Sequence, residues 1–139
     1  MFSGDTRILV VDDSLTIRDG VRAMLNKIGF SLVDEAADGR VAIEKLNRAG
    51  EDSKPYSIVF LDLNMPEIDG LKTLETIRQT PPIQNTPVVI ITTESAKPTV
   101  VRAVMQGVSG YIVKPFSHDD IKKKVIEIFQ RVQEETSAR

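Results

Sequence analysis

The sequence contains no cysteine and a single histidine, His118. Disulfides and thiolate metal sites are therefore excluded, and the chain suits a reducing compartment. A zinc site is excluded as well, because zinc sites in proteins are built mainly from Cys and His ligands. The alternating Asp pattern of a calcium-binding loop, D-x-D-x-D-G, is also absent.

Long apolar runs and a clustered excess of basic charge are missing too. The start, MFSGDTR, lacks the basic and apolar regions of a signal peptide, and no run approaches the ~20 residues that span a bilayer. The 18 basic residues stand against 20 acidic ones, so the net charge of −2 gives no general attraction for nucleic acid. We expect a monomeric cytoplasmic protein without membrane insertion or nucleic-acid binding.

What the 139 residues do contain is an alternation of apolar strand patterns with helical patterns. Strands are predicted at residues 7–12, 30–37, 56–62, 87–93 and 110–114. Helices are predicted at 17–28, 38–50, 71–77, 101–108 and 121–132, the first two ending at Gly29 and Gly50 and the third before Pro81. Such units favour an α/β fold in which helices cover both faces of a parallel sheet. We expect one domain over residues 1–139 with no output domain.

Reactive side chains stand where four of these strands end: Asp12, Asp13, Asp62, Thr92 and Lys114. Taken singly, each has an ordinary interpretation, as a helix cap, a turn former, a β-branched strand residue or a solvated lysine. Together they belong to the edge of a doubly wound sheet where binding sites form. Three neighbouring carboxylates repel one another, so a cation should neutralise them. Lys114 supplies one charge, and Mg²⁺ is the metal that this set of ligands favours.

An acidic edge with Mg²⁺ suits phosphoryl transfer, in which an aspartate can serve as the nucleophile. Asp62 ends the most hydrophobic strand and is the best-placed nucleophile, with Asp12 and Asp13 left for the metal.

Asp12-Asp13, the stretch DLNMPEIDG beginning at Asp62, Thr92, and GYIVKPF at 110–116 together resemble a receiver domain of a two-component response regulator, of the stand-alone CheY-like chemotaxis type. The resemblance implies a doubly wound (βα)5, flavodoxin-like fold with strand order 2-1-3-4-5. It also implies a phosphoprotein: a sensor histidine kinase would phosphorylate Asp62.

The same resemblance assigns the remaining roles. Asp13, Asp62 and the backbone carbonyl of Asn64 would bind Mg²⁺ directly, and Asp12 through a water. Lys114 would contact the phosphoryl oxygens, and its peptide bond to Pro115 is expected to be cis.

Two pairs of residues would then act after phosphorylation. Thr92 would swing toward the phosphoryl group and Tyr111 would turn inward. Asn64 and Glu94 would tune hydrolysis by orienting water. The protein would thus be a self-dephosphorylating phosphoacceptor rather than an enzyme.

A surface for a phosphorylation-dependent target is expected on helix 101–108 and its neighbours. Val101, Met105 and Val108 are predicted to face the core, which leaves a second apolar pair free. The predicted partner surface comprises Lys97, Val100, Val104, Tyr111 and Lys124. The target is expected to be a flagellar motor switch, with a phosphorelay or a phosphate sink as the alternatives. The lysine run at 122–124 is interpreted as a solvated helix face.

Other classes fit less well. A flavin-binding electron carrier needs a neutral phosphate loop after the first strand, where this chain has an anionic DDS. An aspartyl-phosphate phosphatase of the haloacid dehalogenase type needs a second Asp two residues after the nucleophile, where Asn64 stands. A receiver-like module that is never phosphorylated would have no use for the complete acidic set.

Overall fold

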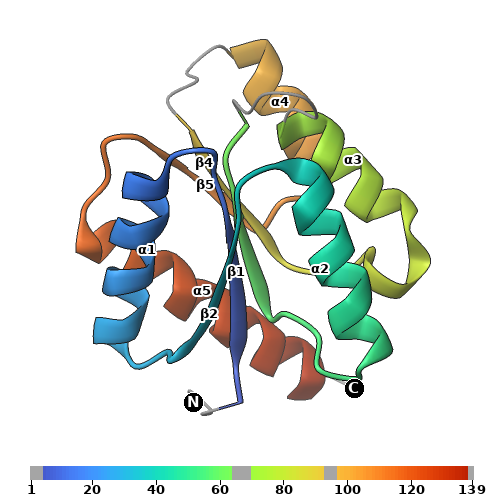
Figure 1. Cartoon of the computed structure of the whole chain (residues 1–139), viewed down its shortest axis with the longest axis horizontal. Coiled ribbons are helices and arrows are strands. Elements are labelled where there is room, and N and C mark those ends of the chain that lie inside the picture. Colours follow the sequence, from blue (N-terminus) through green and yellow to red (C-terminus); the bar gives the residue numbers. More distant parts are fainter. Residues whose placement is uncertain (1–4, 64–69, 93–96, 138–139) are drawn as a thin grey trace.

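A five-stranded parallel sheet with the order β2-β1-β3-β4-β5 forms the centre of the molecule (Figure 1). The computed structural model describes residues 5–63, 70–92 and 97–137, with side chains described except at 97–100 and 132–137. The elements in chain order are β1 (Arg7–Val11), α1 (Leu15–Ile28), β2 (Leu32–Ala36), α2 (Gly39–Glu51), β3 (Ile58–Leu61), α3 (Gly70–Gln79), the 3₁₀ helix η1 (Pro81–Ile83), β4 (Val88–Thr92), α4 (Lys97–Met105), β5 (Gly110–Val113) and α5 (His118–Ser137). The predicted fold class and strand order are confirmed.

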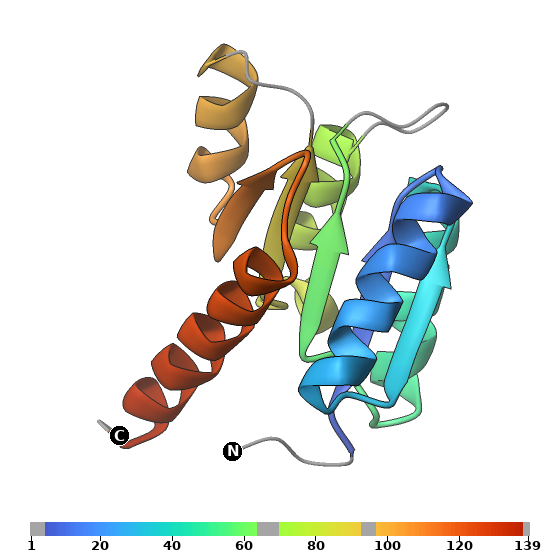
Figure 2. The same cartoon turned by 90° about the vertical axis from the view of Figure 1, so that its left-hand side faces the viewer.

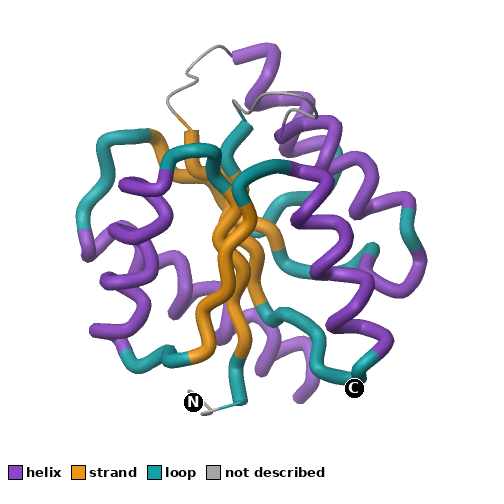
Figure 3. The backbone as a smooth tube through the Cα atoms, viewed as in Figure 1, coloured by secondary structure: helices purple, strands orange, loops and turns teal. Residues whose placement is uncertain are grey.

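Helices cover both faces of the sheet, with α1 and α5 on one side and α2 and α3 on the other (Figures 1 and 3). The strands are apolar at nearly every position because alternate side chains enter opposite cores. In β3, Val59 and Leu61 join the core under α2 and α3, whereas Ile58 and Phe60 join the core under α1 and α5. Each such fully buried side chain stabilises the fold by roughly 1.5–3 kcal/mol.

Helix α2 ends later than the sequence pattern predicts. Gly50 was predicted to close it, but the helix continues through Gly50 to Glu51, and Asp52 is its C-cap. The chain turns at Ser53, whose φ is 58°, and the amide of Lys54 donates to the carbonyl of Ala49 (2.9 Å). The amide of Asp52 donates to the carbonyl of Arg48 (2.9 Å), so the helical hydrogen bonding continues past Gly50.

Helix α4 does not bury the apolar stripe predicted for it. Val101 is 53% exposed and Met105 79% exposed, so their predicted core-facing placement is wrong. Ala103 is the buried residue among the described side chains of α4, and Val108 packs on the core beyond the helix end. Figure 2 shows α4 projecting at one end of the molecule, beside the edge of the sheet that β4 and β5 form. Among the described side chains of α4, residues 101–105, one small side chain is buried at this edge instead of a full stripe.

Candidate functional site

The ends of the strands place the predicted reactive residues along one edge of the sheet. Backbone hydrogen bonds continue past the strands and fix these positions: Asp12 N donates to Ala36 O (3.1 Å), Asp62 N to Val11 O (2.9 Å), and Lys114 N to Thr92 O (2.9 Å). Asp12, Asp62 and Lys114 are therefore held by the sheet itself. The Lys114–Pro115 peptide bond is cis, as expected.

Three carboxylates meet at this edge. One oxygen each from Asp12, Asp13 and Asp62 lies within 4.8 Å of the others. Asp12 and Asp62 are buried, with 2% and 4% exposure, whereas Asp13 is exposed to solvent. A buried pair with one open side gives oxygen ligands and an entry path. These are the features that Mg²⁺ needs, since it keeps several of its waters.

Lys114 joins the cluster from the far side. Its Nζ lies 2.9 Å from Asp12 Oδ2 and 3.5 Å from Asp62 Oδ2. Burial alone would lower the pKa of Lys114, but the hydrogen bond to Asp12 and the charges of Asp62 and Asp12 outweigh it and raise the pKa. Lys114 thus stays charged and neutralises one of three negative charges, which leaves a net charge that a divalent cation balances.

The Asp12 side chain and its backbone are held by two residues that the sequence analysis did not identify. The amide of Ser14 donates to Asp12 Oδ1 (2.9 Å), while Lys114 occupies the other oxygen. Arg18 donates through Nη1 to the carbonyl of Asp12 (2.6 Å) and through Nε to Glu35 (3.0 Å). With both oxygens engaged, Asp12 is better suited to hold a metal-bound water than to ligate a metal directly.

Thr92 and Tyr111 both line a small cavity of about 10 Å³ that Ala103 and Val104 also line. Thr92 is 1% exposed and Tyr111 is 48% exposed. The predicted switch pair therefore lies on neighbouring strands, β4 and β5, with a gap between them next to α4. The movement predicted for the pair stays a prediction.

Gly70 sets the approach of α3 to the end of β3, where Asp62 stands. Its amide donates to Leu63 O (3.0 Å), and a Cβ atom at this position would lie 2.0 Å from Asp62 O. A residue without a side chain is therefore required directly behind Asp62.

The remaining predicted residues divide into two groups. Asn64 and Glu94 lie outside the described residues, as do the side chains of Lys97 and Val100. Val104 is 51% exposed on α4, and Lys124 on α5 lies 3.3 Å from Glu127. Three members of the predicted partner surface thus have described side chains, namely Val104, Tyr111 and Lys124.

The sequence model of the response regulator receiver domain matches residues 8–126. The chain is 37% identical over 126 residues to chemotaxis protein CheY-3 of Vibrio cholerae, covering 91% of this chain and 93% of that protein. It is 34% identical to chemotaxis protein CheY of Pseudomonas aeruginosa, covering 91% and 98% of the two chains.

Solved structures agree with these relatives. The chemotaxis protein CheY4 of Vibrio cholerae superposes with a TM-score of 0.75 at 31% identity, covering 91% of this chain and 98% of that one. CheY in a CheX-CheY-BeF3-Mg²⁺ complex from Borrelia burgdorferi gives a TM-score of 0.81 at 28% identity and 89% coverage of both chains. Across the described residues, no helix has the length and apolarity to cross a membrane.

Proposed function

The chain belongs to the response regulator receiver family, in its CheY-like chemotaxis group, and we propose that it is a phosphoacceptor whose Asp62 receives a phosphoryl group from a sensor histidine kinase. The observation that carries this proposal is the cluster of Asp12, Asp13 and Asp62 with the Lys114 ammonium group reaching into it.

In the proposed reaction, a carboxylate oxygen of Asp62 attacks the phosphorus of a phosphohistidine. An O–P bond forms as the P–N bond breaks, and the electron pair leaves with the imidazole of the kinase. Lys114 moves from Asp62 to a phosphoryl oxygen and offsets its charge while remaining bonded to Asp12. Asp13, Asp62 and the carbonyl of Asn64 would hold Mg²⁺ directly, and Asp12 through a water. The metal supplies charge neutralisation for the phosphoryl oxygens.

Hydrolysis by water would end the signal, with Asn64 and Glu94 orienting the water. The group that is phosphorylated and then hydrolysed is the protein's own Asp62 and not a separate substrate. We therefore propose a signalling protein and not an enzyme. Alanine at both positions should prolong the life of the aspartyl phosphate, as measured by ³²P decay. Unchanged decay would exclude this role.

The signal would leave through α4 and β5. Phosphorylation draws Thr92 toward Asp62, and Tyr111 turns into the space that Thr92 vacates. This movement selects one of two arrangements of α4. The exposed apolar side chains Val101, Val104 and Met105 support a protein target on this face. We propose the surface Lys97, Val100, Val104, Tyr111 and Lys124, with the flagellar motor switch as target. A phosphorelay protein or a phosphate sink is the alternative output.

Beryllofluoride tests the acceptor directly, because it mimics an aspartyl phosphate. In the presence of Mg²⁺ the wild-type protein should form an adduct, visible by ¹⁹F NMR, and Asp62→Asn should form none. Lys114→Met should fold but bind beryllofluoride at least tenfold more weakly. An undiminished adduct in Asp62→Asn would contradict the proposal.

A pull-down with activated and untreated protein tests the output surface. Val104→Glu and Lys124→Glu should reduce capture of the target while the beryllofluoride adduct at Asp62 forms normally. Loss of the adduct in these variants would place the residues in the acceptor site and not on a partner surface.

A further inference from the structure

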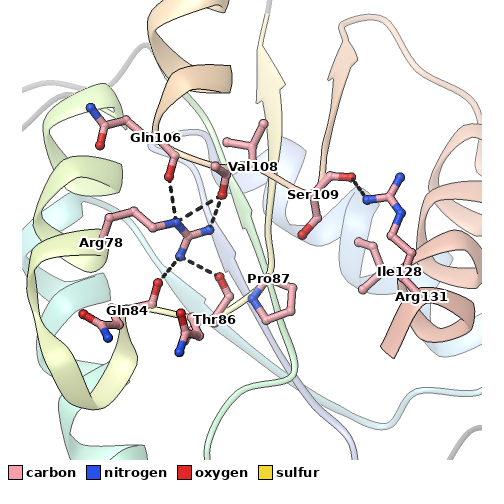
Figure 4. A pocket seen from close by; sticks show the side chains of 11 residues that line it. Arg78, Gln84, Thr86, Pro87, Gln106, Val108, Ser109, Ile128 and Arg131 are labelled. Atoms are coloured by element: carbon pink, nitrogen blue, oxygen red, sulfur yellow. Dashed lines mark hydrogen bonds between the residues drawn. The ribbon is translucent and has the colours of Figure 1, made fainter. Parts of the chain in front are cut away.

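A second pocket lies at the end of the sheet opposite the acidic cluster. It has a volume of about 410 Å³, within the range of small-molecule sites. The residues before β4, the link between α4 and β5, and the side of α5 form its walls, as Figure 4 shows. None of these residues takes part in the proposed phosphoryl transfer.

The pocket is lined by two guanidinium groups, those of Arg78 and Arg131, and by no aspartate or glutamate among the described residues. Elsewhere four of the described arginines pair with carboxylates: Arg7 with Asp34, Arg18 and Arg22 with Glu35, and Arg102 with Glu75. Around this pocket the formal positive charge is not balanced by an ion pair within the described part of the chain. In a protein of net charge −2, that is a local reversal of sign.

The guanidinium group of Arg78 is held in place by hydrogen bonds. It is partly buried and donates to four backbone carbonyls, those of Gln84, Thr86, Gln106 and Gly107, at 2.7–3.1 Å. Carbonyl dipoles satisfy its N–H groups but carry no net charge, so the potential of the cation remains in the pocket.

Arg131 carries the part of this positive charge that is available to a ligand. It is exposed, and its Nη1 donates to the carbonyl of Ser109 (3.1 Å). Its Nε and Nη2 groups are left to donate to a ligand, in the planar arrangement that matches a carboxylate. Figure 4 shows Arg78 on one side of the pocket and Arg131 on the other.

Pro87 and Val108, both half-buried, add apolar surface to the lining between the two arginines. Such a lining favours a ligand with an apolar part beside its charge over a small inorganic ion. We propose that this pocket binds an organic carboxylate with a short apolar group, its carboxylate held by Arg131 and its apolar part on Pro87 and Val108.

The test is a titration of the ¹⁵N-labelled full chain with N-acetylleucine, followed by two-dimensional NMR. Amides of residues 84–86 and 106–109 should shift saturably at millimolar concentrations. N-acetylleucinamide, which lacks the carboxylate, and acetate, which lacks the apolar group, should each bind at least tenfold more weakly. Equal binding of the amide would overturn the proposal, as would shifts that do not map to this pocket.

Arg131→Gln should weaken N-acetylleucine at least tenfold without changing the circular dichroism spectrum. Arg48→Gln, at an exposed arginine on α2 that does not line this pocket, is the matched control and should bind like wild type. Unchanged affinity in Arg131→Gln would overturn the proposal. A peptide ending in free leucine distinguishes the source: tighter binding than N-acetylleucine assigns the carboxylate to a chain terminus, and equal binding assigns it to a free acid.

Discussion

The pKa of Tyr56 is strongly shifted by the surroundings of its hydroxyl group. Its hydroxyl donates to Asp34 Oδ2 (2.6 Å), and the Arg7 guanidinium lies 4.5 Å from the centre of its ring. Burial, followed by the hydrogen bond to Asp34 and the charge of Asp34, raises the pKa of Tyr56 to about 12. An unfolded tyrosine has a pKa of about 10.

The stability that this shift contributes is fully present below about pH 10 and is lost as the pH rises toward 12, because the unfolded chain ionises first. Tyr111→Phe leaves Tyr56 as the one tyrosine, so absorbance at 295 nm reports it alone. At pH 11 only about one tenth of Tyr56 should be ionised. Asp34→Asn should lower the midpoint. A midpoint near 10 in a chain that keeps its far-UV spectrum would refute the expected shift.

Side chains that directly follow an apolar strand were predictable from sequence. Asp12, Asp62 and Lys114 each end a strand, and parallel strands bring their ends together. Arg18 was not predictable in the same way. Its bond to the carbonyl of Asp12 depends on how α1 packs beside β2, and an arginine in the first turn of a helix carries no such signal.

At the scale of elements, the junction of β3 and α3 depends on one glycine. Gly70→Ala would place a methyl group against the backbone of Asp62 and Leu63, where neither neighbour can rotate away. We expect a loss of about 1–3 kcal/mol in the free energy of unfolding and weaker beryllofluoride binding, because the strain falls on Asp62 itself.

Gly20→Ala is the matched control for this change. Nothing lies within 4 Å of a Cβ at Gly20, which is inside α1. Alanine should therefore stabilise the helix by roughly 0.5–1 kcal/mol. Urea unfolding of both variants checks the pair. Equal effects of the two changes would show that the contact behind Asp62 is not restrictive.

Arg78 connects three segments that the sequence separates: the end of α3, the turn before β4, and the link from α4 to β5. Arg78→Met leaves four carbonyls without their charged donor and should cost about 1–3 kcal/mol in urea unfolding. Arg48→Met, at an exposed position, should change stability by less than about 0.5 kcal/mol. A comparable loss in both variants would mean that the bonds of Arg78 add little to the fold.

Element boundaries were less predictable than element types. Gly50 is a helix-stop signal in the sequence, yet helical hydrogen bonding continues past it to the amide of Asp52. In α4 the periodicity of Val101 and Met105 is real, but periodicity shows only that a face is apolar. What covers that face depends on the helix's position at the sheet edge, and here it is exposed.

For the molecule as a whole, the carboxylates that would bind a cation also destabilise the fold when no cation is bound. Three carboxylates against one ammonium group repel one another when no cation is present. Asp13→Asn relieves this repulsion at an exposed position. We therefore expect the variant to melt at a higher temperature than wild type in EDTA and at a lower one in excess Mg²⁺.

The order of the two melting temperatures should reverse when Mg²⁺ is added, because a metal that binds only the folded chain stabilises it. At a metal concentration of 100 times the Kd, this stabilisation is about 2.7 kcal/mol. Calorimetry with and without Mg²⁺ measures both arms. Asp19→Asn, an exposed change on α1, should shift both melting temperatures together. A wild-type melting temperature that does not change when Mg²⁺ is added would exclude the cluster as a metal site.

The shallow seating of α4 has a consequence for the order in which the molecule opens. Over the described side chains 101–105, α4 buries Ala103 and leaves Val101, Val104 and Met105 exposed, so this part of the helix has little free energy to lose on detaching. Helix α5 buries Ile121, Val125 and Ile128, and its Phe129 ring stacks on Phe30 (5.9 Å between centroids). Native-state hydrogen exchange should therefore find the amides of α4 opening by local fluctuation, while those of α5 exchange only with global unfolding. The helix on the proposed partner surface should thus open more readily than α5.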